Sequence, residues 1–335
     1  MHPNLDRALE PAARTMSATV AGFATALLIE RRAHPGSYIV VLAVVLTMNL
    51  SRTGPKQYAA VLPARAAALA VQILMRQSYW LGEPAFIAAV SGAIWIRRFG
   101  GASARIGTML TLPFLATLIA PAPPSLDSLL WTVLVAATSV VWALLFAEPT
   151  EPAASAAPVR SRRSRAAGAM AAQMAVGLAA AFVLGRWLFP GHWTWPVLTA
   201  YIVAAGNRGR RDVVHKAGLR LLGAAIGTAL ASGPDFDPGD DRGIVILFVV
   251  LAVATALRPL SYAFWAAGAT GALALLYGYY GASGPQLLLT RLEGILLGAA
   301  VSVAAACLIR PVRSRPPGER RPYAADPGPV ASPRE

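Results

Sequence analysis

The sequence predicts an all-α integral membrane protein of about twelve transmembrane helices, arranged as two parallel six-helix repeats. Apolar residues make up 56% of the 335-residue chain and charged residues only 14%, whereas soluble domains average about 25% charged residues. The apolar residues form continuous runs, which favours helices over the alternating strands of a membrane β-barrel. At about 20 residues per span, this length leaves no room for a large soluble domain.

The first repeat is predicted at residues 1–147. Its apolar runs place helices near residues 15–29, 37–50, 58–75, 79–96, 104–120 and 127–147. The first run follows Arg7 and Arg14, as in a signal peptide, but is itself followed by Glu30, Arg31 and Arg32 rather than by a small-residue cleavage site. We therefore predict that this helix is retained.

The second repeat is predicted at residues 166–309, with helices near residues 167–189, 193–206, 213–232, 243–257, 260–280 and 287–309. Residues 148–165 are rich in Pro, Ala, Ser and Arg, the composition of a flexible linker. Residues 310–335 are rich in Pro and Arg and carry few apolar residues to bury, so we predict a disordered basic tail.

Three matches at a constant offset support a repeat. Pro35-Gly36 corresponds to Pro190-Gly191, Gly54 to Gly209, and Arg65 to Arg220. Each match falls at the same predicted element of its half. We therefore expect the two halves to share one six-helix plan.

The distribution of Lys and Arg predicts the orientation. With twelve crossings, most of the basic residues, including the linker and tail arginines, fall on the side of both termini, which the positive-inside rule makes cytoplasmic. The second segment of each half has only about 14 residues, a length also typical of re-entrant segments. Five crossings per half would scatter the basic turns over both sides, so the charge distribution favours a cell inner-membrane protein with twelve crossings.

Two helices carry the same chemical pattern, an arginine followed by two glycines four residues apart. The pattern is RLLGAAIG at 220–227 and RLEGILLG at 291–298. Gly223 and Gly227, like Gly294 and Gly298, permit close helix packing. Because a charge in hydrocarbon costs roughly 2.5–3.5 kcal/mol, Arg220 and Arg291 should face protein or water. A snorkelling Arg220 and an Arg220 that attracts an organic anion both fit this pattern.

Aromatic residues cluster near the predicted helix ends. A membrane-interface belt is the ordinary explanation for such residues. Trp195 and Tyr201 have a second interpretation, because they lie on the short helix before Arg220 and are able to stack on an aromatic ligand.

Other functions have weaker support in the sequence. The loop DFDPGDD at 235–241 suggests magnesium binding in a membrane enzyme of prenyltransferase type. No second aspartate cluster accompanies it, so we interpret it as a solvated acidic loop. Cys307 is the only cysteine, and the four histidines lack ligand spacing. We predict no cofactor, no bound metal and no enzymatic activity.

The formal net charge of +14 would suggest nucleic acid as a partner in a soluble protein. Here the basic residues lie between apolar spans, so membrane topology and anionic lipid on the cytoplasmic side explain them better. We predict no binding to nucleic acid.

The motifs HWTWPVLTA at 192–200, RLLGAAIGT at 220–228 and the 291–298 helix resemble the fusaric acid resistance protein-like family. This family includes aromatic acid exporters and is related to the membrane part of the aluminium-activated malate transporters. The resemblance covers the second half well, and the first half only through Arg65. It implies a six-helix unit used twice around a pathway for organic anions, with Arg220 and Arg65 along it.

Together these observations predict an exporter of small organic anions, most specifically aromatic carboxylates. The predicted substrate-binding residues are Arg220, Arg65, Arg291, Trp195 and Tyr201. A passive anion channel using the same arginines is the main alternative, and a homo-oligomer is compatible with either function.

Overall fold

The computed structural model describes residues 3–51, 58, 61–99, 101–119, 125–146, 160–206, 209–232, 239–258, 260–281 and 285–309. Within these ranges the fold is all-helical, as the sequence predicts, with twelve α-helices and no strand. The helices are α1 (Pro3–Ala33), α2 (Tyr38–Leu50), α3 (Val61–Gln77), α4 (Tyr79–Trp95), α5 (Gly101–Ile119), α6 (Leu126–Leu145), α7 (Arg160–Leu188), α8 (Thr194–Ala204), α9 (Arg210–Ala231), α10 (Asp241–Leu257), α11 (Tyr262–Tyr279) and α12 (Pro285–Leu308); a 3₁₀ turn, η2 (Ile96–Phe99), follows α4.

Each predicted helix is present, and the largest differences lie at the starts of α1 and α7. Helix α1 begins twelve residues before its predicted start because Leu, Ala, Glu and Arg there favour helix, and Arg14 pairs with Glu10 one turn earlier. Helix α7 begins at Arg160, so the four arginines of the predicted linker lie in its first turns. The rest of that linker and the tail from residue 310 lie outside the described residues.

In the described ranges, six helices are long and apolar enough to cross a membrane, namely α1, α4 with η2, α6, α7, α9 and α12. Their outward faces carry exposed large apolar side chains, including Leu130, Val183, Trp187, Leu230 and Leu296. Lipid tails accept such side chains, and every helix satisfies most backbone groups internally. The protein is therefore a multi-pass membrane protein.

Two of the predicted spans are short in the structure. Helix α2 has 13 residues and α8 has 11, which at about 1.5 Å per residue is less than the roughly 30 Å of hydrocarbon. Helix α2 is apolar on every side and almost entirely buried. Such a helix belongs to the protein interior rather than to the lipid boundary.

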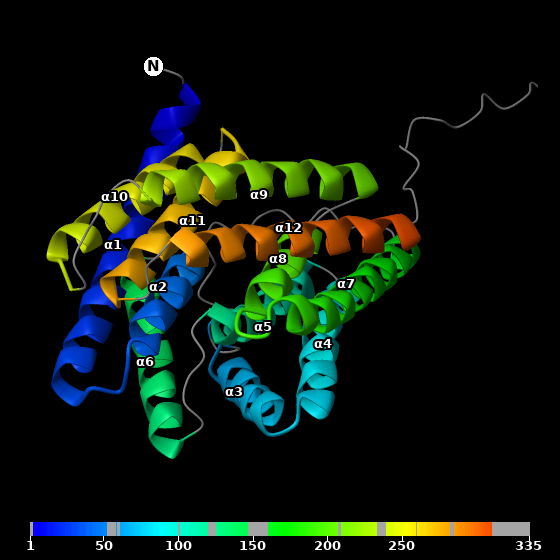
Figure 1. Ribbon diagram of the computed structural model, residues 1–335, viewed down its shortest axis with the longest axis horizontal. Helices are drawn as coiled ribbons and strands as arrows, with labels where there is room; N and C mark the ends of the chain where they lie inside the picture. Colours follow the sequence, from blue (N-terminus) through cyan, green and yellow to red (C-terminus); the bar gives the residue numbers. More distant parts are fainter. Residues whose placement is uncertain are drawn as a thin grey trace, which may run out of the picture.

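The two halves of the chain are interleaved. Helix α1 packs against α10, and α4 packs against α7. One buried cluster joins α1, α2 and α6 to α10 and α11, and a second joins α3, α4 and α5 to α7 and α8. Glu83 of α4 also forms an ion pair with Arg186 of α7. In Figure 1, α9 and α12 lie side by side across the view, and α1 and α6 pack together at its left.

Within each half the helices pack in corresponding pairs. In the first half α2 contacts α1 and α6, and α5 contacts α3 and α4. In the second half α8 contacts α7 and α12, and α11 contacts α9 and α10. These pairs correspond between the halves, whereas the packing of α3 on α4 has no equivalent of similar extent between α9 and α10.

Candidate functional site

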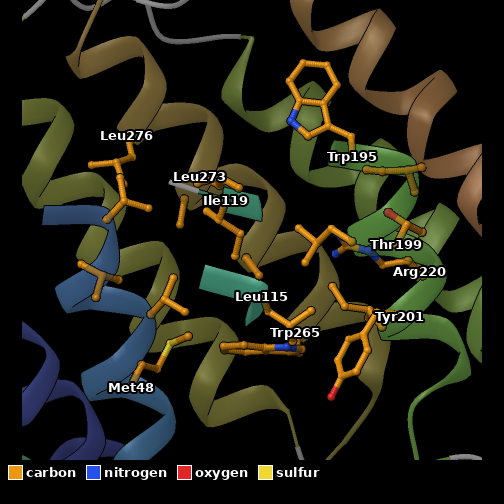
Figure 2. A pocket seen from close by; sticks show the side chains of 18 of the residues that line it. Met48, Leu115, Ile119, Trp195, Thr199, Tyr201, Arg220, Trp265, Leu273 and Leu276 are labelled. Carbon is orange, nitrogen blue, oxygen red and sulfur yellow. The ribbon is translucent and has the colours of Figure 1, made fainter. Parts of the chain in front are cut away.

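The candidate site is a cavity of about 350 Å³, here called the central cavity, at which both halves meet (Figure 2). Helices α2, α5, α8, α9, α10, α11 and α12 contribute to its wall. Its lining residues are Val41, Val44, Val45, Met48, Asn49, Leu115, Ile119, Trp195, Leu198, Thr199, Tyr201, Ile202, Ala205, Lys216, Arg220, Leu247, Leu251, Tyr262, Trp265, Ala269, Ala272, Leu273, Leu276, Tyr277, Arg291 and Ile295.

Arg220 reaches the cavity from the middle of α9. Its side chain is 7% exposed, and its Nη1 donates a hydrogen bond to Thr270 Oγ1 on α11 at 3.3 Å. Its Nε, although buried, has no hydrogen-bond partner among the described residues. Figure 2 shows the guanidinium beside Thr199, within the wall of the cavity. The guanidinium therefore lies inside the protein and can donate a further hydrogen bond.

Arg291 approaches the same point from α12. It is 4% exposed, and its Nη1 donates to the backbone oxygen of Thr270 at 3.3 Å. Its guanidinium carbon lies 6.0 Å from the centre of the Tyr277 ring. Two arginines from different helices thus converge on one threonine.

Lys216 adds a third positive group to the lining of the cavity. It lies one turn before Arg220 on α9, and its Nζ donates to the backbone oxygen of Ala205 at 2.7 Å. The same Nζ lies 5.5 Å from the centre of the Tyr262 ring. These contacts hold the ammonium group at the cavity wall.

The positive charges of the cavity are not neutralised by the described residues. None of the residues lining the cavity is an Asp or Glu, and the ion pairs within the described ranges join Arg14 to Glu10 and Arg186 to Glu83. Burying unpaired charge costs several kcal/mol. A cavity of this kind favours a bound anion, which would provide the missing countercharge.

Aromatic side chains surround these cations. Trp195 and Tyr201 come from α8, and Tyr262, Trp265 and Tyr277 from α11. The Tyr201 hydroxyl lies 2.9 Å from Thr111 Oγ1, which fixes its ring in the wall. Figure 2 shows Trp195 at one end of the cavity, with Tyr201 and Trp265 at the opposite end.

The glycines place both arginines by allowing close helix contact. A Cβ on Gly223 would lie 2.6 Å from the Ala263 oxygen of α11, and one on Gly227 would collide with the Ala267 oxygen. A Cβ on Gly298 would likewise collide with the Pro196 oxygen of α8, whereas Gly294 faces Pro196 and Trp195. The glycine face of α9 thus packs on α11 and that of α12 packs on α8.

Four of the five predicted substrate-binding residues, Arg220, Arg291, Trp195 and Tyr201, line the central cavity. Arg65 lies apart from it. Arg65 is fully buried on α3, and its Nη1 donates to the Pro113 oxygen of α5 at 3.2 Å. Its Nε and Nη2 have no hydrogen-bond partner among the described residues. This arginine contacts α5 in the first half as Arg220 contacts α11 in the second.

We expect Arg65→Met to leave the affinity for an organic anion within about twofold of the parent, because Arg65 does not face the cavity. Protein stability should stay equal or rise, since replacing buried charge by apolar volume is often neutral or stabilising by about 1–4 kcal/mol. Binding and thermal unfolding of the purified protein measure both effects. A large loss of affinity in a well-folded variant would instead place Arg65 on the substrate path.

Sequence reasoning did not select Lys216, Tyr262, Trp265 and Tyr277 for the site. A signal was present for Lys216, which precedes Arg220 by one helical turn. For the aromatic residues only the packing of α11 on α9 reveals the side they face.

The aspartates proposed for magnesium binding give no metal site in the described part of the chain. Asp235 and Asp237 lie outside the described residues. Asp240 caps α10, and its Oδ1 accepts a hydrogen bond from the Arg242 backbone N–H at 2.9 Å. No group of three or more His, Cys, Asp or Glu with metal-binding geometry occurs within the described ranges.

Residues 175–305 match the model of a protein family described as fusaric acid resistance protein-like. The resemblance drawn from the motifs at 192–200, 220–228 and 291–298 is thereby confirmed, because all three lie inside the match. The matched region runs from within α7 to within α12 and so contains Arg220 and Arg291, whereas Arg65 lies before it. No curated protein and no solved structure matches the chain.

Proposed function

We propose, from the fusaric acid resistance protein-like match over the second half, that this multi-pass membrane protein is a transporter that exports small aromatic carboxylates. The observation that carries the proposal is the composition of the central cavity. Three cationic side chains and five aromatic side chains line it, and no acidic residue does. Its volume of about 350 Å³ lies within the range of roughly 300–1,000 Å³ typical of small-ligand pockets.

The proposed binding mode follows from this arrangement. The carboxylate lies between Arg220 and Arg291, where guanidinium groups form strong charge-assisted hydrogen bonds to planar acceptors. The aromatic ring extends among Trp195, Tyr277 and the aliphatic wall, where it loses contact with water. Binding thus supplies countercharge and apolar contact at the same time.

The proposed direction rests on the ends of the helices. Lys216 lies near the start of α9, and Ala205 directly follows α8. In the twelve-crossing topology these ends are cytoplasmic, as are both chain termini. An anion would therefore meet Lys216 first and then move toward Arg220 and Arg291. We place the protein in the cell inner membrane, where anionic lipid would contact its basic cytoplasmic side.

We also propose that the two halves are parallel repeats. Most corresponding helices, though not the α3–α4 pair, have corresponding packing partners, and Arg65 and Arg220 donate to equivalent helices, α5 and α11. The repeat would set the six-helix plan, whereas the central cavity uses the arginines of the second half only. The two halves would thus share a packing plan but differ in whether their arginine lines the cavity.

A substrate-panel flux assay tests the function. Vesicles containing the purified protein should transport labelled benzoate and larger aromatic carboxylates, each compared with its neutral amide and with vesicles lacking protein. A neutral amide carries no negative charge to pair with Arg220 and Arg291. We therefore expect carboxylate flux to exceed amide flux by about tenfold or more. The assay is run with and without a pH gradient.

Equal protein-dependent flux of acid and amide would refute the anion assignment. A steady anion conductance in a planar bilayer, without dependence on a second gradient, would reassign the protein as a passive channel.

A further inference from the structure

A second cavity, of about 650 Å³, adjoins the central cavity. Its lining residues include Arg76, Ile119, Arg186, Trp195, Tyr277 and Leu287. Three of these residues, Ile119, Trp195 and Tyr277, also line the central cavity. The two spaces are therefore neighbours with a shared wall.

The shared wall lies at the ends of its helices. Ile119 ends α5, Trp195 is the second residue of α8, and Tyr277 is in the last turn of α11. The second cavity continues past these ends to Gly191 and Leu287. At the opposite ends of α8 and α11, the central cavity is lined by Lys216 of α9, which donates to Ala205 just after α8, and by Tyr262, the first residue of α11. The cavities thus follow one another along the helices.

Specific contacts close the shared wall. The Tyr277 hydroxyl donates to the Ile119 backbone oxygen at 3.3 Å, which ties the end of α11 to the end of α5. The Trp195 ring lies on the His192 ring with centroids 4.4 Å apart, and its Cβ adjoins Gly294 of α12. Neither contact is part of a helix's own backbone hydrogen bonding, so both aromatic side chains can rotate away without breaking a helix.

The second cavity resembles the central one in charge. Its ionisable lining groups are Arg76, Arg186, Tyr79, His192 and Tyr277, and no acidic residue lines it. Arg186 is paired with Glu83, whereas the exposed Arg76 keeps its positive charge available to an anion. An anion that passed the shared wall would again meet positive charge and aromatic rings.

We infer that the second cavity is a second anion-binding site in series with the central cavity. Trp195 and Tyr277 form the wall that separates the two cavities, and the anion passes between these two side chains. The inference rests on the proposed function for its ligand, a small aromatic carboxylate. Two sites in series allow binding that is firm enough to admit the anion and weak enough to release it.

Thiol labelling tests the wall independently of transport. In a Cys307→Ser background, Thr199→Cys reports on the central cavity and Leu287→Cys on the second. A membrane-impermeant anionic thiosulfonate is added to right-side-out and to inverted vesicles. From the side at which Leu287→Cys reacts rapidly, Thr199→Cys should react slowly, and Trp195→Ala should accelerate its labelling by about tenfold or more because the wall is opened.

Trp187→Ala is the matched control, because this tryptophan of α7 is 78% exposed and lies in neither cavity. It should leave the labelling rate of Thr199→Cys unchanged. Tyr277→Phe, which loses the hydroxyl and its hydrogen bond to Ile119 but keeps the ring, should give a smaller acceleration than Trp195→Ala. If labelling of Thr199→Cys were fast with Trp195 intact, or unaffected by Trp195→Ala, the proposal that Trp195 and Tyr277 separate the two cavities would be wrong.

Arg76→Gln tests the second site. We expect it to reduce the preference of Leu287→Cys for the anionic over a cationic thiosulfonate by about threefold or more, since one nearby charge is lost. An unchanged preference would overturn the anion site. If labelling follows these expectations but no aromatic carboxylate is transported, the wall stands and the substrate class of the proposed function fails.

Discussion

Arg220→Gln is expected to lower the affinity for an aromatic carboxylate by about 10- to 100-fold. The glutamine amide is polar but shorter than the arginine, whose Nη1 donates to Thr270 Oγ1 at 3.3 Å, and it provides no positive charge. Hydrogen bonds to charged groups contribute roughly 1.5–3 kcal/mol, and each 1.4 kcal/mol corresponds to a factor of ten. Competition for labelled benzoate flux in vesicles measures the loss.

Two further variants separate the local effect of the Arg220 guanidinium from the effect of charge alone. Arg220→Lys keeps the charge without the planar fork and should retain part of the affinity. Arg211→Gln removes a charge from an exposed position on the same helix and should leave affinity unchanged. If Arg211→Gln reduced affinity as strongly as Arg220→Gln, the general potential of the protein rather than the cavity would be responsible.

The convergence on Thr270 gives a sharper form of the same test. Arg220 and Arg291 donate to the side chain and the backbone of this one residue. A carboxylate held by both should therefore couple them. In a double-mutant cycle with Arg291→Gln, the paired variant should lose less binding free energy than the two single losses together. Strict additivity would mean that the arginines act on the anion separately.

The sequence predicted the helices well because continuous apolar runs determine where membrane helices lie. It also predicted that Arg220 and Arg291 face protein or water, since a charge in lipid is costly. In the structure both arginines are buried, and the glycines adjoin α11 and α8.

The partners of each helix could not be predicted in this way. Periodicity indicates which face of a helix is buried but not which helix covers it. Arg65 and Arg220 occupy corresponding positions in the two halves, yet only Arg220 lines the central cavity. The difference arises from how the halves interleave, with α1 on α10 and α4 on α7. Tyr262 and Trp265 join the site through the packing of α11 on α9, which periodicity alone does not show.

Gly227→Ala is expected to destabilise the fold by about 1–3 kcal/mol or more, the usual cost of overpacking a tight contact. The added Cβ would collide with the Ala267 oxygen and lie 3.0 Å from the Gly271 nitrogen. These are backbone atoms of α11 and cannot rotate away. Thermal unfolding of the detergent-solubilised protein should show a clear fall in Tm.

Gly218 provides the matched control on the same helix, because a Cβ there would meet no atom within 4 Å. Gly218→Ala should therefore stabilise α9 by about 0.5–1 kcal/mol through its helix propensity. If the two alanine variants unfolded at the same temperature, the close packing of α9 on α11 would be wrong. Because that packing also brings Arg220 within 3.3 Å of Thr270, Gly227→Ala should weaken anion binding even in the fraction that remains folded, whereas Gly218→Ala should not.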